Sequence, residues 1–317
     1  MINYVARRMG QAVVVVLGVS VLVFSLLHAL PGGPARAILG THFTPQRYAV
    51  LSRQLGLNLP VWQQYLIWAD QVVHLNLGYS YVLDVPVFQV IADSLPNSVF
   101  LVGLGTLEAL CIAVPLGIYQ ALRRNTTGDY ALTTINFFLY SMPIFWIGLM
   151  AILWLAVTVP IFPVGGLQAP GEPGFDVVQR LYHVALPSLV LAAVQVAAWS
   201  RYMRSSMLDA IVQDYIRTAR AKGLSTFQTV VRHALRNALI PIITLVGLSL
   251  PTLFGGALVT ESVFNYPGIG WTFWTATQQE DFPILLAIVL IVSLTTVVGN
   301  LLADILYAVV DPRVRYG

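Results

Sequence analysis

The stretch ILLAIVLIVSLTTVVGNLLADILYA, residues 284–308, decides the fold class of this chain. It holds one charged residue, Asp304, among otherwise apolar or small side chains. A helix needs about 20 mainly apolar residues to cross the roughly 30 Å of hydrocarbon in a bilayer. The stretch therefore predicts a transmembrane helix.

Five further segments meet the same criterion. They are roughly 9–30, 98–121, 131–159, 184–203 and 238–260. The segment 131–159 is long, and a tilt or a broken end would accommodate it. Of the 317 residues, 57% are hydrophobic and 10% are charged, whereas soluble domains carry roughly 25% charged residues. We therefore predict an all-α membrane protein of about six spans, with residues 1–317 forming one transmembrane domain.

The distribution of basic residues predicts the orientation. With the N-terminus in the cytoplasm, 13 of the 17 basic residues lie on cytoplasmic segments, as the positive-inside rule requires. The outside then keeps Arg36, Arg47, Arg53 and Arg180. We predict that both termini are cytoplasmic, with a tail over 309–317.

The predicted external loop over 31–97 carries helix signals. Thr44 and Pro45 are typical of an N-cap followed by proline at the first helical position, and Gly56 is a typical stop. A second amphipathic pattern begins at Pro60. We expect a small helical cap on the outer face.

Two features complete the external side. Trp62, Tyr65 and Trp68 in the cap suit a water–lipid interface. The loop over 160–176 is rich in glycine and proline and should lack regular structure.

No constellation of catalytic or metal-ligating residues is visible in the sequence. The five histidines are scattered, and neither an HExxH pair nor a GxSxG elbow occurs. The only lysine, Lys222, precedes Gly223, whereas a P-loop needs lysine followed by serine or threonine. We predict no catalytic residue, no metal site and no cofactor in this chain, so ATP hydrolysis would need another polypeptide. The net charge of +3 is too small to indicate nucleic acid as a partner.

Glu108 lies about 15 Å into the second predicted span at 1.5 Å per residue. A carboxyl group at that depth must face protein or water, or be protonated. Glu108 is therefore either a pore-lining or proton-linked group, or a neutral, hydrogen-bonded packing residue.

The fifth predicted span is interrupted by prolines and glycines. Proline removes a backbone hydrogen bond and kinks a helix, and the freed carbonyl then needs a partner in protein or pore water. The pattern predicts a bent, pore-lining gate helix, or else a kinked packing helix. The candidate gate residues are Pro251, Gly255 and Gly256.

The predicted cytoplasmic loop over 205–236 contains the most informative segment. The stretch DYIRTARAKGLSTFQTVVRHALRNALIP begins at Asp214 and is cationic, yet has helical periodicity. Tyr215, Ile216 and Ala219 can share one face, and Gly223 should end the first short helix. A basic loop can also serve only topology and lipid headgroups. The candidate coupling residues are Asp214, Tyr215, Ile216, Arg217, Thr218, Ala219, Arg220, Ala221, Lys222 and Gly223.

This segment resembles the permease subunits of bacterial binding-protein-dependent ABC importers. The general family pattern begins with EAA, where this chain has Arg217-Thr218-Ala219, and Arg236 stands where a proline is usual. These departures match the peptide/nickel subfamily, whose variant reads close to DYxRTARAKGLS…HALRNAxxP. Further matches are YVARR and HALPGGPA near the start, with Gly33 in place of an aspartate, then SMPIFWIG, TESVFNYPGIG and DILYAVVDPRVRYG.

The resemblance implies a permease subunit in a bacterial inner membrane. It implies a homologous second permease, two ATPase subunits that bind ATP and magnesium, and an extracytoplasmic substrate-binding protein. Residues 214–223 would be the coupling helix, which fits a groove on one ATPase. We expect its apolar side to be buried in that contact, and Arg217 and Arg220 to pair with acids or carbonyls there. We expect Gly223 to adopt a left-handed conformation. The motif at 260–270 marks the external face through Glu261, Pro267, Gly268 and Gly270.

Three functions compete at this point. The leading one is an ATP-driven importer of dipeptides, oligopeptides or similar small solutes, with the substrate selected largely by the binding protein. A proton-coupled secondary transporter would use Glu108 as its proton site. A membrane scaffold without transport needs neither Glu108 nor the coupling segment.

Overall fold

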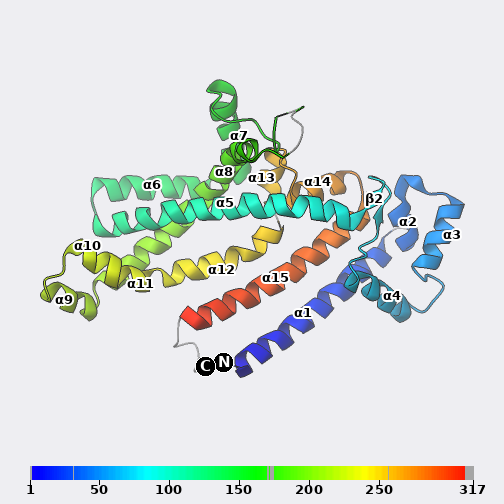
Figure 1. The fold of residues 1–317 in the computed structure, drawn as a ribbon, viewed down its shortest axis with the longest axis horizontal. Helices are drawn as coiled ribbons and strands as arrows, with labels where there is room; N and C mark the ends of the chain where they lie inside the picture. The colour runs from blue at the N-terminus through cyan, green and yellow to red at the C-terminus, as the bar shows by residue number, and fades with distance from the viewer. Residues whose placement is uncertain (1, 31, 170, 172–174, 256, 311–317) are drawn as a thin grey trace. The chain divides into compact units, whose positions relative to one another are not determined.

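The computed structural model describes residues 2–30, 32–169, 171, 175–255 and 257–310. They are mostly helical (Figure 1). Their contacts divide them into two compact units. One unit comprises Met1–Val99, Pro251–Ser262 and Pro267–Leu301, and the other comprises Phe100–Leu250, Val263–Tyr266 and Leu302–Gly317.

The first unit contains the first and last long helices and the external cap. Its elements are α1 (Ile2–Ala29), α2 (Gly33–Leu39), the short 3-10 helix η1 (Gly40–His42), α3 (Pro45–Gln54), α4 (Val61–Val73), β1 (Tyr79–Ser80), β2 (Val85–Pro86), α13 (Leu258–Val263), α14 (Ile269–Gln278) and most of α15 (Phe282–Val310). Strands β1 and β2 form an antiparallel pair in which Tyr79 faces Pro86.

The second unit contains the helices around the cytoplasmic segment. Its elements are α6 (Thr127–Ser141), α7 (Ile144–Ile152), the π-helix η2 (Leu153–Thr158), α8 (Val177–Ile211), α9 (Asp214–Ala221), α10 (Thr226–Thr229), the π-helix η3 (Val230–Ala234) and α11 (Leu235–Ala238). Helices α5 (Val87–Leu122) and α12 (Ile240–Gly255) contribute residues to both units.

Four described helices are long and apolar enough to cross a membrane, and six spans result if each of two bent helix pairs counts as one. This agrees with the prediction of about six spans. Helices α5 and α8, with 36 and 35 residues, both extend well beyond the predicted ranges 98–121 and 184–203.

The third predicted span is broken in its middle. Helices α6 and α7 meet at an angle of 102°. We predicted that a tilt or a broken end would accommodate the long segment 131–159, but the break lies in its middle and not at an end. Met142, the first residue after α6, has an extended backbone because it precedes Pro143, and a residue before proline disfavours the helical region.

The fifth predicted span bends at its cytoplasmic end. The helical segments Thr226–Ala238 and Ile240–Ser249 differ in direction by 46°. The bend lies just before Pro241, whereas the backbone of α12 continues as a helix through Pro251 to Gly255.

The external cap confirms the predicted helix signals. Thr44 caps α3 by accepting a hydrogen bond from the Arg47 backbone N–H at 3.2 Å, with Pro45 at the first helical position. Helix α2 and the hairpin were not predicted. In the hairpin the Tyr79 hydroxyl donates to Asp84 at 2.8 Å, and this bond to a carboxylate raises the pKa of Tyr79. No regular structure occurs in the described part of 160–176, as predicted.

Candidate coupling site and external motif

Helix α9 covers the predicted coupling segment, and its apolar side faces its own chain. Ile216 is 1% exposed and packs in a cluster that contains Met207 and Ala210 of α8 and Val230 of η3. Ala219 is also buried. The prediction that these two side chains would be buried against a partner ATPase was wrong, because the chain itself covers them.

Tyr215 is the one member of that predicted apolar face that stays exposed. Its hydroxyl accepts a hydrogen bond from the Asn237 side chain at 3.0 Å. Tyr215 therefore ties α9 to α11 while its ring remains accessible.

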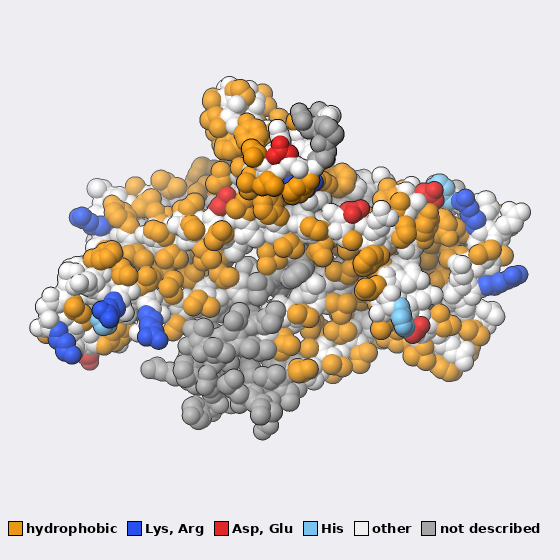
Figure 2. Space-filling model, in the orientation of Figure 1, with side chains coloured by type: hydrophobic (Ala, Val, Ile, Leu, Met, Phe, Trp, Pro, Cys, Tyr) orange, Lys and Arg blue, Asp and Glu red, His pale blue; other side chains and the backbone are white. Residues whose placement is uncertain are grey.

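The outward side of α9 is cationic. Arg217, Arg220 and Lys222 are exposed, and Figure 2 shows Lys and Arg side chains over the region of α9–α11. The only ion pair described on α9 joins Arg217 to Asp214 at 3.5 Å, with side chains 80% and 96% exposed. Such an exposed pair contributes little to stability. Thr218 bonds back to the Asp214 carbonyl at 3.0 Å, and Ala221 is exposed at the end of the helix.

Gly223 ends α9 in the left-handed conformation that the sequence predicts, with φ +84°. Its N–H donates to the Arg220 carbonyl at 3.0 Å, and the Leu224 N–H donates to the Ala219 carbonyl at 3.4 Å. These two bonds form a Schellman motif. An added Cβ would meet no atom of the described chain within 4 Å, so a side chain here would project into open space.

An exposed apolar pair follows α9 and was not predicted. Ser225 and Gln228 form a capping box that starts α10, and this cap holds Phe227 in the first turn of the helix. Phe227 is 75% exposed, and Val231 is also exposed. Residues four apart share one side of a helix, so the pair forms a small apolar surface on the segment that follows α9.

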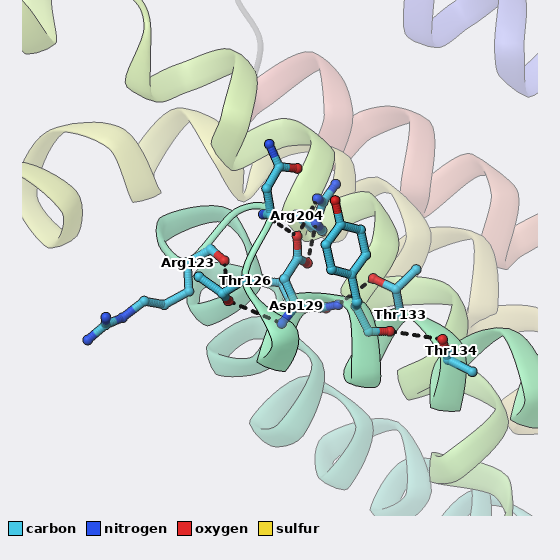
Figure 3. A network of polar contacts seen from close by, with 9 residues as sticks. Arg123, Thr126, Asp129, Thr133, Thr134 and Arg204 are labelled. Carbon is cyan, nitrogen blue, oxygen red and sulfur yellow. Dashed lines mark hydrogen bonds and ion pairs between the residues drawn. The ribbon is translucent and has the colours of Figure 1, made fainter.

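A second missed feature is a partly buried ion pair between α6 and α8 (Figure 3). Arg204 Nε and Nη2 donate to the two carboxylate oxygens of Asp129 at 2.9 and 2.8 Å. The Asn125 backbone N–H adds a third bond at 3.0 Å, and Thr126 caps α6 by accepting from the Asp129 N–H at 3.4 Å. This bidentate pair joins α6 to α8 about two turns before α8 ends at Ile211.

A second polar tie joins the same two helices. The Asn136 amide donates to the Ser200 hydroxyl at 2.8 Å, and both side chains are buried. The two ties together hold the cytoplasmic half of α8 against α6, and α8 leads directly into α9.

Glu108 is partly buried on α5. It accepts a hydrogen bond from the Ser188 hydroxyl at 3.1 Å. Its second carboxylate oxygen is buried and has no hydrogen-bond partner among the described residues. The bond from Ser188 fits the interpretation of Glu108 as a hydrogen-bonded packing residue.

The predicted gate residues lie at the end of α12. Pro251 is helical, and Gly255 is the last residue of the helix. A Cβ on Gly255 would approach Val292 to 3.3 Å, so glycine permits close contact with α15. Gly256 lies outside the described residues.

Glu261 of the external motif is fully buried and completely engaged. Its carboxylate accepts bonds from the Ser98 hydroxyl at 2.7 Å and from the backbone N–H groups of Ala257 and Trp271, both at 3.0 Å. Ser98 in turn accepts from the Ile269 N–H at 2.7 Å. Since Ile269 and Trp271 belong to the first turn of α14, Glu261 satisfies a helix N-terminus where negative charge is stabilising.

The other residues of the motif pack tightly around this carboxylate. The Pro267 carbonyl accepts from the Asn97 amide at 2.8 Å. A Cβ on Gly268 would collide with Ser98 and Glu261, and one on Gly270 would collide with the backbone of Leu258. The structure thus brings Glu261, Pro267, Gly268 and Gly270 together around one buried carboxylate.

Family models match nearly the whole chain. The model described as "Binding-protein-dependent transport system inner membrane component" matches residues 113–316, and the corresponding N-terminal model matches residues 1–102. The chain therefore belongs to the family of binding-protein-dependent transport system inner membrane components. It is a multi-pass inner membrane protein and an ABC transporter permease, as the sequence motifs predicted.

Curated relatives match over their full length. The chain is 39% identical to the oligopeptide transport system permease protein AppB of Bacillus subtilis (strain 168), over 100% of both chains. It is 35% identical to the dipeptide transport system permease protein DppB of Escherichia coli (strain K12), over 100% of this chain and 99% of the relative.

A solved structure shares the fold. A chain from an inward-facing crystal structure of the MetNI methionine ABC transporter aligns with a TM-score of 0.55 and 15% identity, covering 70% of this chain and 97% of that one. At this identity the likeness concerns the fold alone, and it supports an importer permease fold.

Proposed function

We propose that this chain is the channel-forming permease subunit of an ATP-driven importer of dipeptides or oligopeptides. The observation that carries the proposal is the full-length similarity to permeases of oligopeptide and dipeptide transport systems. A homologous second permease, two ATPase subunits and an extracytoplasmic binding protein would complete the complex.

Within this proposal α9 is the contact with an ATPase. A partner can shift a conformational equilibrium only if its contact differs in energy between the two states. The surface available for such a contact consists of Arg217 and Arg220 with the exposed rings of Tyr215 and Phe227. Acidic groups or carbonyls on the ATPase would pair with the arginines, while the buried Ile216 transmits the movement to α8.

The test is reconstitution of the chain in proteoliposomes with a homologous permease, ATPase subunits and a binding protein from the same organism. We expect uptake of radiolabelled alanyl-alanine that requires ATP and survives a protonophore. Uptake that survives ATP depletion but stops with the protonophore would instead favour proton coupling, with Glu108 as the site to mutate. ATP-driven uptake of another solute, without competition by peptides, would keep the importer and refute the peptide class.

The purified chain alone should hydrolyse no ATP, because its single lysine does not stand in a P-loop. Hydrolysis should appear only when ATPase subunits are added. Robust hydrolysis by the chain alone would contradict the proposed division of labour.

A further inference from the structure

The first unit contains a partly open cavity of about 500 Å³ that the proposed function does not use. This volume lies within the range of small-molecule sites. Most of its walls are apolar, with Val23 and Leu27 from α1, Trp68 and Val72 from α4, and Leu286 and Leu290 from α15.

The depth of the cavity follows from the two long helices. The apolar span of α1 ends at Ala29, and that of α15 begins at Phe282. Val23 lies roughly 9 Å before the end of α1, and Leu290 lies roughly 12 Å beyond the start of α15, at 1.5 Å per residue. Both helix ends are predicted to be external, so the cavity lies at the depth of the outer leaflet.

Contacts between α4 and α1 place α4 at the same depth. The Tyr65 hydroxyl bonds to the Ser20 hydroxyl at 2.8 Å, roughly 14 Å before the end of the α1 span. Nearer that end, the Gln64 side chain bonds to His28 at 2.9 Å. The ring of Phe24 packs between these bonds, 5.4 Å from the ring of Tyr65. Helix α4 therefore lies along the outer half of α1.

The opposite side of α4 is apolar and uncovered in this chain. Trp62, Leu66 and Val73 recur at helical spacing and are all exposed, Val73 to 78%. An apolar helix face at this depth borders lipid. Lipid chains thus border the outer side of α4, whose inner side forms one wall of the cavity.

We propose that the cavity is a binding site for one outer-leaflet phospholipid, with an acyl chain held among α1, α4 and α15. The mainly apolar walls interact weakly with water, and an acyl chain among them would make dispersion contacts with the lining. Acyl chains are the apolar molecules available at this depth. Gln54, Gln71 and Asn76 also line the cavity, and these neutral donors suit the ester carbonyls of a glycerolipid.

The site would make lipid a structural partner of the external cap. The cavity wall joins α3 and α4 of the cap to the two long helices α1 and α15. A bound acyl chain would fill the space between them and fix the cap against the span ends. This inference is independent of the transported solute.

The test uses the complete transporter in vesicles of phosphatidylethanolamine and phosphatidylglycerol that contain a phosphatidylethanolamine with a diazirine on its acyl chain. After illumination, peptide mass spectrometry maps the labelled residues. We expect labelling of the cavity-lining residues of α1, α4 and α15, unaffected by excess alanyl-alanine. Labelling that the dipeptide displaces would overturn the assignment to lipid, as would labelling of the lining no greater than that around the exposed Val298.

Two neighbouring residues provide a matched pair of variants. Val72→Trp places a large side chain in the cavity, whereas Val73→Trp places the same side chain on the outer, lipid-facing side of α4. Labelling of the lining should fall about tenfold in the first variant only. Leu286→Trp, with Val298→Trp as its control on α15, repeats the test should Val72→Trp fail to assemble. Equal labelling in a folded cavity variant and its control would refute the site.

Discussion

The external motif at 260–270 and the cytoplasmic helix α9 use charge in opposite ways. Glu261 has no exposed surface, and three donors from its own chain saturate it. Arg217 and Arg220 point outward, and the described ion pair of Arg217 is long and exposed. A buried, saturated charge stabilises one arrangement of the chain, whereas an exposed, unsaturated one is available to a partner.

The two regions also use glycine differently. Gly268 and Gly270 are needed for space, because a Cβ at either position would collide with the chain. Gly223 is needed for its backbone conformation, since the space around it is open. Substitutions in the external motif should therefore disturb packing. Substitutions in α9 should disturb the turn at its end or its exposed surface.

The largest loss of stability should come from removing the Glu261 carboxylate from the external motif. In Glu261→Ala the Ser98 hydroxyl and two backbone N–H groups lose their acceptor, and each buried, unpaired donor costs about 1–3 kcal/mol. We expect a loss of at least about 3 kcal/mol, measured as a lower melting temperature of the purified complex or as its failure to assemble.

Two further variants calibrate this loss of stability: Glu261→Gln is an intermediate case, and Glu280→Gln is a control. Glu261→Gln keeps one acceptor oxygen and should lie between wild type and alanine. Glu280 is exposed, so the same change there should have no effect. A stable Glu261→Ala complex would show that the buried carboxylate does not stabilise the motif.

The next effect should come from the ion pair between α6 and α8. Asp129→Asn removes the charge that faces Arg204, but Arg204 is 28% exposed and can be partly rehydrated. We therefore expect a loss of about 2 kcal/mol, below the 3–5 kcal/mol of a fully buried pair. Because α8 leads into α9, substrate-stimulated ATP hydrolysis should fall further than basal hydrolysis.

A double-mutant cycle separates this pair from general damage. Asp129→Asn and Arg204→Gln should be less than additive, with an interaction energy of roughly 0.5–3 kcal/mol. The exposed Asp209, changed to asparagine, serves as the control. Additive losses from the two changes would mean that the residues act separately.

The sequence predicts the apolar layout of this molecule well and its tertiary contacts poorly. The apolar segments place the helices because crossing lipid demands length and composition. The signals for the break at Met142 and the bend before Pro241 are the prolines that follow them. A single proline does not reveal the size of a bend, because packing of the two flanking segments sets the angle.

Tertiary packing also explains why the prediction that Ile216 and Ala219 would be buried against an ATPase was wrong. The spacing of Ile216 and Ala219 shows that something covers this face, but a helical stripe does not name what covers it. Asp129 and Arg204 are 75 positions apart, and neither stands out locally, since an acid after an N-cap threonine is ordinary capping chemistry. Ser98 is equally inconspicuous until folding places it beside Glu261.

A smaller effect should follow from strain at the end of α9. A β-branched side chain at φ +84° costs about 1–2 kcal/mol. Gly78 provides a matched control, because its φ is +94° and its surroundings are equally open, but it lies in the external cap. Gly223→Val and Gly78→Val should lower the melting temperature similarly, while only Gly223→Val should reduce co-purification of the ATPase subunits. Equal retention of the ATPases in both variants would argue that the turn at Gly223 plays no part in docking.

The smallest effect on stability, and the sharpest test of the comparison, is expected on the outward face of α9. Arg217→Ala removes an exposed pair at 3.5 Å, and such pairs contribute about 0–1 kcal/mol. Arg217→Ala combined with Arg220→Ala should therefore leave the melting temperature of the isolated subunit unchanged. The same double variant should lose most of its bound ATPase and its substrate-stimulated hydrolysis, because these cations are available to acidic groups on the partner. Arg53 is an exposed arginine on α3 of the external cap, and Arg53→Ala should affect neither the melting temperature nor ATPase binding.

A salt series sharpens this test. Docking that relies on exposed charges is screened by salt, so ATPase retention by the wild type should weaken at high ionic strength, and the double variant should show less of this dependence. If the double variant melts early, its arginines stabilise the chain as Glu261 does, and the contrast between the two regions fails. If it melts normally and retains the ATPases at every salt concentration, the exposed charge of α9 is not the docking surface, and the apolar pair Phe227 and Val231 becomes the next surface to mutate.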